Sequence, residues 1–280
     1  SLSYYINMQQ YGSSPKLYGT YYSAPATDVR QKLAGYNKVG GKYEPYYRPE
    51  YEYNKNFETI FPRMYSPDPE HEKEYVYWGK VTGRRYTLGS GSNREVLVCP
   101  TFGENLRFFF RYQVGFMYLR YFMWNFAGRQ NDMQANGNSL QGNWISGIKF
   151  IDEARLGPLD EMPLDVQDNP ARNTYFFLPL LIGIAGLLWQ YKRDRNGFVL
   201  VMAFFIMTGL AIILFLNQNP SQPRERDYAY AGSFYAYAIW IGLGFMFVWE
   251  KLNRFIDTRL SAALTFVLLF VSAPLLMRMQ

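Results

Sequence analysis

The feature that most constrains this 280-residue chain is a set of four long apolar stretches near its C-terminal end. They cover residues 174–191, 197–216, 228–249 and 260–277, and the charged residues there lie mainly in the connectors. A helix needs about 20 mostly apolar residues to cross roughly 30 Å of hydrocarbon. The four stretches therefore predict four membrane-spanning helices, an interpretation favoured over four buried helices of a soluble protein.

The rest of the chain has a different composition. Residues 1–105 are rich in Tyr, Pro, Gly and charge, and aromatic residues alternate with polar ones there, as in short strands and turns. Residues 106–126 form an aromatic helix candidate, but Arg107, Arg111 and Arg120 are too many charges for a lipid-facing span. We expect that helix to lie at the membrane surface, with its arginines reaching toward lipid phosphates.

The predicted fold class is therefore mainly α, a helical integral membrane bundle with about four C-terminal spans. The bundle occupies residues 173–280. An extramembrane α+β region (residues 1–105) and an interfacial aromatic helix with an outer loop (residues 106–172) precede it.

Basic residues in the connectors predict the orientation of the bundle. By the positive-inside rule, the connectors between the first two and the last two spans face the cytoplasm. Their basic residues are Lys192, Arg193, Arg195, Lys251, Arg254 and Arg259. Residues 1–172 and the loop 217–227 then lie on the outer side. An exported N-terminal region with no signal segment after Ser1 predicts that the chain is a C-terminal portion of a longer multi-spanning protein.

Some kinds of site are disfavoured by composition. Cys99 is the only cysteine and His71 the only histidine, so an internal disulfide or a Cys/His metal site is not expected. The formal net charge of +6 comes from scattered residues, so nucleic acid is not an expected partner. Exposed tyrosines also suit carbohydrate, but ordinary packing is the favoured role for them.

Three polar strings adjoin the predicted spans on the outer side: AGRQND (127–132), NPARN (169–173) and QNPSQPRERD (218–227). Arg224 and Arg226 offer planar two-pronged donors that suit a phosphate or a carboxylate. With Arg129 and Arg172 they predict an anion site, and simple salt bridging is the alternative. Asp227 is also a candidate cap for the helix beginning at Tyr228. Supporting polar roles are expected for Gln130, Asn131, Asp132, Glu225 and Asp227.

Longer strings resemble a known family. They are RYFMWNFAGRQND, GNWISGIKFID, NPARN, NQNPSQPRERDYAYAGSFYAYAIWIGLG, FPRMYS (61–66) and PTFGENLRFF (100–109), and they cover most of the chain. They are similar to blocks of a bacterial multi-spanning membrane family that carries a domain of unknown function and is protein O-mannosyltransferase-like. The resemblance implies a glycosyltransferase of the C-type superfamily in the bacterial inner membrane.

Such an enzyme passes a sugar from a polyprenyl-phosphate lipid to an acceptor, here expected to be a protein, on the non-cytoplasmic face. The four arginines would stabilise the charge that develops on the leaving phosphate. The resemblance places the catalytic carboxylate in an outer loop upstream of this chain, so no catalytic residue is assigned here. The donor is a substrate and no cofactor is expected, although some relatives in that superfamily use a divalent ion.

Two non-enzymatic alternatives stay open. The chain could be a membrane subunit of an envelope or secretion assembly, with the outer region as a docking module, or a transporter. Transport is the less favoured, because Gln190 and Thr208 are the main polar residues within the predicted spans.

Overall fold

The computed structural model describes residues 14–88 and 94–271, and the chain forms two compact units. The first unit contains Ser1–Arg111 and Leu216–Ser221, and the second contains Tyr112–Phe215 and Gln222–Gln280. The boundary divides the polar string 218–227, so that its first four residues belong to one unit and its last six to the other.

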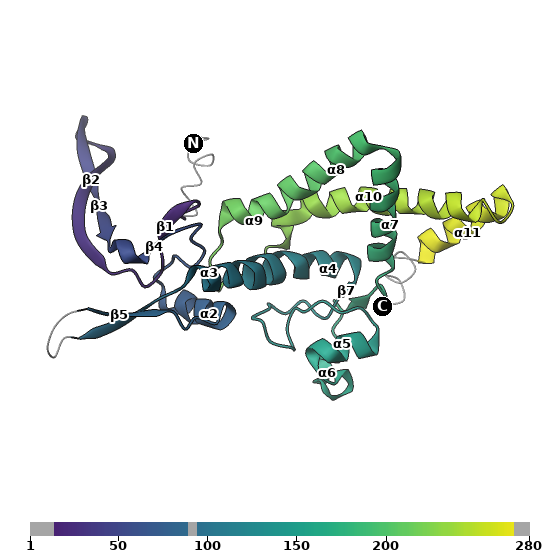
Figure 1. Ribbon diagram of the computed structural model, residues 1–280, viewed down its shortest axis with the longest axis horizontal. Coiled ribbons are helices and arrows are strands. Elements are labelled where there is room, and N and C mark those ends of the chain that lie inside the picture. Colours follow the sequence, from purple (N-terminus) through teal and green to yellow (C-terminus); the bar gives the residue numbers. More distant parts are fainter. Residues whose placement is uncertain (1–13, 89–93, 272–280) are drawn as a thin grey trace. The chain divides into compact units, whose positions relative to one another are not determined.

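The first unit combines short sheets with two helices (Figure 1). Its strands pair antiparallel as β1 (Tyr18–Thr20) with β4 (Glu58–Ile60), β2 (Ala26–Val39) with β3 (Lys42–Tyr53), and β5 (Arg84–Leu88) with β6 (Glu95–Cys99). Its helical segments are η2 (Lys55–Phe57), α2 (Pro69–Gly79) and α3 (Phe102–Phe108).

The longest strands form an exposed hairpin. Gly40 and Gly41 connect β2 to β3 with φ values of 57° and 86°, the positive region that a tight two-residue hairpin turn requires. Almost every residue of both strands is exposed, including Tyr36, Tyr43 and Tyr47. The segments in which aromatic and polar residues alternate thus form strands, as predicted, but the hairpin contributes little to a core.

The core of the first unit contains fully buried Phe57, Met64, Tyr75 and Phe108. Asn217 joins the segment Leu216–Ser221 to the rest of the first unit. Its Nδ2 donates to the carbonyl oxygens of Pro15 at 2.7 Å and Pro62 at 2.9 Å.

A buried carboxylate fixes the start of α3. Thr101 and Glu104 form a reciprocal capping box at its N-terminus. Glu104 also accepts from the N–H groups of Thr82 at 2.7 Å and Gly83 at 3.1 Å. Burial alone would raise its pKa, but these N–H donors outweigh burial and hold the pKa of Glu104 at about 2.

The second unit is mainly helical (Figure 1). Its helices are α4 (Arg120–Phe126), α5 (Lys149–Leu156), η5 (Leu159–Glu161), α6 (Leu164–Gln167), α7 (Leu178–Arg193), α8 (Arg195–Thr208), α9 (Leu210–Leu216), η6 (Asp227–Tyr230), α10 (Ala231–Leu252) and α11 (Thr258–Phe270). Strands β7 (Gly128–Arg129) and β8 (Asn173–Thr174) form a short antiparallel ladder.

Helix α4 lies in the core of this unit. Phe122 and Phe126 of α4 pack with Tyr237 and Trp240 of α10 in one buried aromatic cluster. The Trp240 ring is fully buried, so this cluster holds α4 against the apolar helices.

Helices α7 and α10 approach each other closely. A Cβ atom added at Gly186 would lie 1.9 Å from the Trp240 carbonyl oxygen, and one at Gly244 would lie 2.1 Å from the Ile182 carbonyl oxygen. The Trp240 Nε1 donates to the buried Gln190 Oε1 at 2.8 Å. Glycines thus permit backbone contact, and the polar residue noted within the first predicted span satisfies a buried indole.

The predicted aromatic helix over residues 106–126 is confirmed as helical. It is continuous from α3 through a π-helical stretch, η4 (Phe109–Leu119), to α4. Two of its arginines bind protein carbonyl groups, Arg107 that of Gly79 and Arg111 that of Trp78, both at 3.1 Å. Its place at a membrane surface stays a prediction.

The predicted bundle of about four spans is wrong. Within residues 14–88 and 94–271, two helices are long and apolar enough to cross a membrane, Arg195–Leu216 (22 residues) and Asp227–Leu252 (26 residues). About half of the protein is helical and several sheets accompany the helices, so a mainly helical membrane bundle does not describe it.

The other two stretches do not form helices of that length within the described residues. Residues 173 and 174 pair with β7, and Phe176 and Phe177 adopt left-handed φ values of 53° and 58°, so α7 begins only at Leu178. Its 16 residues extend about 24 Å, short of a bilayer core. Helix α11 has 13 residues, and residues 272–277 of the fourth predicted span lie outside the described residues.

Candidate functional site

The candidate site lies beside α4 in the second unit. Arg120, Tyr121 and Trp124 of this helix are 5%, 1% and 6% exposed. The Tyr121 and Trp124 rings meet edge to face with centroids 5.0 Å apart. This aromatic surface is the platform against which the remaining residues of the site lie.

Glu225 is the centre of a closed hydrogen-bond network. Its Oε2 accepts from the Arg120 Nη2 at 2.8 Å and from the Tyr121 hydroxyl, and its Oε1 accepts from the Ala135 N–H at 2.7 Å. The Arg120 Nη1 lies 3.3 Å from Oε1 and 2.8 Å from the Gly142 carbonyl oxygen. Both carboxylate oxygens and the guanidinium are therefore occupied by protein.

The environment keeps this pair ionised. Burial opposes the charge on Glu225, but the hydrogen bond and charge of Arg120, with the Ala135 N–H, lower the pKa of Glu225 below its ordinary value. Burial raises the pKa of the Tyr121 hydroxyl, which therefore remains a donor to Glu225. The network acts as a neutral support rather than as an acid or a base.

Arg226 lies next to this network and is not neutralised by it. Its backbone N–H donates to the Tyr121 hydroxyl at 3.1 Å. Its side-chain Nε is buried, and in the described part of the chain it has no hydrogen-bond partner. A buried guanidinium nitrogen without an acceptor is uncommon, and a bound anion or an ordered water would supply the acceptor.

Arg129 approaches the platform on Trp124. Its guanidinium carbon lies 4.2 Å from the centroid of the Trp124 ring, and that of Arg120 lies 4.6 Å from the same centroid. The Arg129 Nε donates to the Asn131 carbonyl oxygen at 2.9 Å. The structure thus places Arg129, Glu225 and Arg226 around Tyr121 and Trp124.

The remaining two predicted arginines lie elsewhere in the second unit. Arg224 is exposed, with its guanidinium carbon 6.0 Å from the centroid of the Tyr228 ring. Arg172 borders a cavity of about 300 Å³ that is also lined by residues 167–170, 173 and 174. This cavity adjoins Arg129 through β8, because the Arg129 N–H donates to the Asn173 Oδ1 at 3.0 Å.

Gln130 and Asn131 are fully buried and organise the loop after α4. The Asn131 Nδ2 donates to the Leu140 carbonyl oxygen at 2.7 Å, and its Oδ1 accepts from the Gly142 N–H at 2.8 Å. The Gln130 Oε1 accepts from the Asn143 Nδ2 at 2.9 Å. These two amides support the carbonyl that binds Arg120 and point to no ligand.

The two predicted aspartates have different outcomes. Asp132 is exposed and accepts from the Asn169 Nδ2 at 3.2 Å, which joins two of the polar strings. The predicted capping role of Asp227 is wrong: Asp227 lies inside the first turn of η6, and no side-chain hydrogen bond caps that turn. Its charge still suits the positive end of the helix.

Sequence reasoning missed the partner of Glu225. Arg120 had been given a role toward lipid phosphates, whereas it is buried and bound by Glu225, 105 residues away in the sequence. The spacing of Arg120 and Trp124, four residues apart on a helix, was an available signal that both lie on one face.

The charge balance separates these arginines into two groups. Arg120 has a carboxylate partner, whereas none of the ion pairs found among residues 14–88 and 94–271 includes Arg129, Arg172, Arg224 or Arg226. In the same described part, no group of three or more His, Cys, Asp or Glu side chains is placed to hold a metal.

Comparison with known protein families gives a match in the N-terminal part of the chain. Residues 12–110 match a family of unknown function (DUF8416), which covers most of the first unit and none of the candidate site. No curated protein matches the chain. No solved structure matches it either.

Proposed function

We propose that this chain is part of a membrane-bound glycosyltransferase that uses a polyprenyl-phosphate sugar as donor. The observation that carries the proposal is the group of arginines without carboxylate partners beside the closed Arg120–Glu225 pair, above all the buried Nε of Arg226. A phosphate presents pairs of oxygens that an arginine can bind with two parallel hydrogen bonds.

The Arg120–Glu225 pair supports this assignment because Glu225 does not neutralise the neighbouring arginines. Because Glu225 is fully bound by Arg120, Tyr121 and Ala135, it is not available to neutralise Arg226. Arg129, on the Trp124 ring, is likewise not matched by an acid. A surplus of fixed positive charge next to a rigid aromatic platform suits a leaving phosphate, whose charge grows as the glycosidic bond breaks.

The two candidate spans support a membrane location. Only 11% of the most apolar part of Arg195–Leu216 and 33% of that of Asp227–Leu252 is buried inside the protein. Much apolar surface of these helices therefore remains for contact with lipid. We further propose that the membrane is the bacterial inner membrane and that sugar transfer takes place on its non-cytoplasmic face. The acceptor is then a protein on that face, and a carboxylate acts as base toward its hydroxyl.

The proposal is tested on the full-length protein with a long-chain polyprenyl phosphate and the corresponding mannosyl lipid. Arg226→Lys keeps the charge but loses the two-pronged donor, so binding and transfer are expected to fall about tenfold or more. Arg129→Ala removes the guanidinium that lies over Trp124, so it is expected to weaken donor binding without changing acceptor binding. Arg30→Lys, on the exposed hairpin, is the matched control and should change neither. Unchanged donor binding in both site variants would overturn the proposal.

A docking role is a second candidate, favoured by one observation. The β2–β3 hairpin presents two long, almost wholly exposed strands whose tyrosines contribute little to a core. Such a hairpin suits contact with another protein of an envelope assembly. If the full-length protein binds no polyprenyl phosphate, while removal of residues 27–52 releases a protein partner, this role replaces the transferase.

A further inference from the structure

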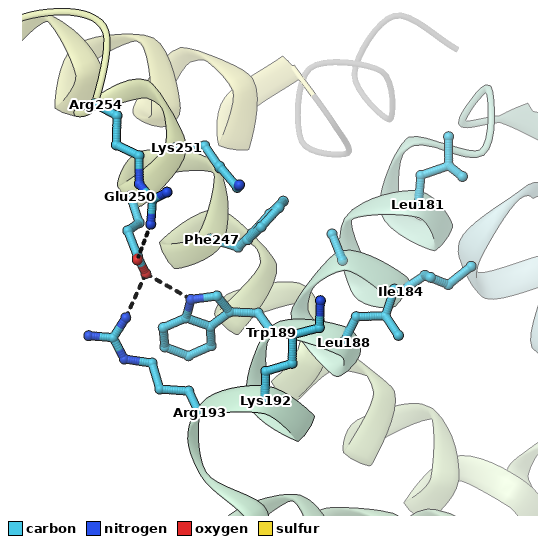
Figure 2. Close-up of a pocket in the computed structure, with 11 residues that line it drawn as sticks. Leu181, Ile184, Leu188, Trp189, Lys192, Arg193, Phe247, Glu250, Lys251 and Arg254 are labelled. Atoms are coloured by element: carbon cyan, nitrogen blue, oxygen red, sulfur yellow. Dashed lines mark hydrogen bonds and ion pairs between the residues drawn. The ribbon is translucent and has the colours of Figure 1, made fainter.

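A second feature of the helical unit lies away from the arginine site. A groove of about 640 Å³ runs between α7 and α10 (Figure 2). We call it the α7–α10 groove. It is lined by Leu181, Ile184, Ala185, Leu188, Trp189, Lys192, Arg193, Phe247, Glu250, Lys251 and Arg254.

One wall of the groove is apolar and open. Leu181, Ile184 and Leu188 share a face of α7 and are 58%, 42% and 53% exposed. Phe247 projects from α10 into the space between the two helices (Figure 2). Because α10 belongs to a helix long and apolar enough to cross a membrane, acyl chains are the surroundings that this wall suits.

The other end of the groove is strongly basic. Lys192 and Arg193 lie in the last turn of α7, Lys251 lies in the last turn of α10, and Arg254 follows that helix. Glu250 is the one acidic residue in the lining. Four cations against one carboxylate leave a surplus of three positive charges.

Glu250 forms ion pairs with the two arginines and with neither lysine. Its Oε2 accepts from the Arg193 Nη1 at 2.8 Å, and its Oε1 lies 3.4 Å from the Arg254 Nη2. In the described part of the chain no ion pair includes Lys192 or Lys251. The Lys251 Nζ stands 5.6 Å from the centroid of the Phe247 ring, at the change from basic to apolar lining.

Helix ends account for only part of this surplus. Each helix C-terminus carries roughly half a negative charge, so two ends are balanced by about one cation. The Trp189 indole donates to the Glu250 Oε2 at 2.9 Å, which holds an aromatic ring at the polar end of the apolar wall. An amphipathic ring at such a boundary is typical of the level of lipid headgroups.

We infer that the α7–α10 groove binds an anionic glycerophospholipid. An acyl chain would lie along Leu181, Ile184 and Leu188, and the headgroup phosphate would lie between Lys192 and Lys251. The charge of the basic end selects an anionic over a zwitterionic headgroup. The inference is independent of the proposed transferase, because it uses none of the arginines of that site.

The test measures lipid retention by native mass spectrometry of the chain released from nanodiscs. Palmitoyl-oleoyl phosphatidylglycerol should be retained and the phosphatidylcholine of the same chains should not. Lys192→Gln with Lys251→Gln is expected to weaken phosphatidylglycerol binding roughly 30-fold, about fivefold for each lysine. Arg195→Gln with Arg259→Gln is the matched control, since it removes two exposed connector charges outside the groove and should leave binding unchanged.

A second variant separates the lipid from a free anion. Leu188→Gln keeps every charge and should reduce phosphatidylglycerol retention, whereas soluble glycerol phosphate should not displace the lipid from the wild-type chain. Equal retention of both lipids, or the same loss in the lysine pair and the control pair, would overturn the inference. So would a chain that retains no lipid and instead forms dimers through this face.

Discussion

The regions around Glu225 and Glu250 both place a carboxylate among arginines, yet they differ in burial and in charge balance. Glu225 and Arg120 have side chains 19% and 5% exposed, and their network is closed by Tyr121 and Ala135. Glu250 and Arg193 are 32% and 61% exposed, and two further lysines remain without an acid.

The comparison shows that the role of an arginine–glutamate pair depends on its burial. In a buried setting the pair must be complete, because one unmatched charge in a low-dielectric interior is strongly destabilising. In an open setting solvent screens each charge, so a surplus is tolerated and remains available for a ligand. The closed Arg120–Glu225 pair therefore supports structure, whereas the surplus charges around Glu250 are suited to binding.

The largest expected effect comes from breaking the closed pair. Glu225→Gln leaves the buried Arg120 guanidinium without its counter-charge and should lower the free energy of unfolding by about 3–5 kcal/mol. Glu250→Gln, the matched change in the open region, should lower it much less, because solvent screens the exposed charges there. Unfolding of both variants in the same detergent gives the comparison. Similar losses for the two would show that burial does not distinguish the regions.

The next largest effect concerns Glu104, a buried carboxylate that is bound without an arginine. Glu104 is held by N–H and hydroxyl donors, with a pKa of about 2 in the folded chain. An unfolded glutamate titrates near 4.3, so the unfolded state binds more protons between these values. This stabilisation is fully present above pH 4.3 or so and should be lost as the pH falls toward 2. Reduced by solvent screening, the loss should be about 2–3 kcal/mol.

Hydrogen exchange of the Thr82 and Gly83 amides follows this loss, because both donate to Glu104. Glu104→Gln should exchange faster at neutral pH and show little further change on acidification. Glu95→Gln, an exposed change on β6, should keep the acid-dependent loss of the wild-type chain. Acid-independent exchange of these amides in the wild-type chain would contradict the prediction.

The smallest effect concerns the helix contact beneath the open region. An alanine Cβ at Gly186 would meet backbone atoms of Trp240 and Gly244, which cannot rotate away, so Gly186→Ala should cost about 1–3 kcal/mol. Gly242→Ala on α10 meets no atom within 4 Å and should be neutral or stabilising by up to about 1 kcal/mol. Thermal unfolding of the pair measures the difference, and equal midpoints would show that the helices are not in backbone contact.

The sequence predicted the elements that depend on local composition. The aromatic run ending at Phe126 is helical, and two of the four apolar stretches form helices of membrane-spanning length. It also drew attention to Arg129, Glu225 and Arg226, which meet around one aromatic platform. These features could be predicted because hydrophobicity, charge and helical periodicity can be read from short segments of sequence.

Only the tertiary structure decided where the helices begin and which charges meet. Apolar character continues from Thr174 through Tyr191, but pairing of β8 with β7 removes residues 173 and 174 from α7, and no local pattern indicates that ladder. Arg120 looked available for a phosphate until the fold brought Glu225 to it across 105 residues. The sequence thus determines which side chains are charged. The fold determines which of those charges are neutralised, because their partners lie far away in the sequence.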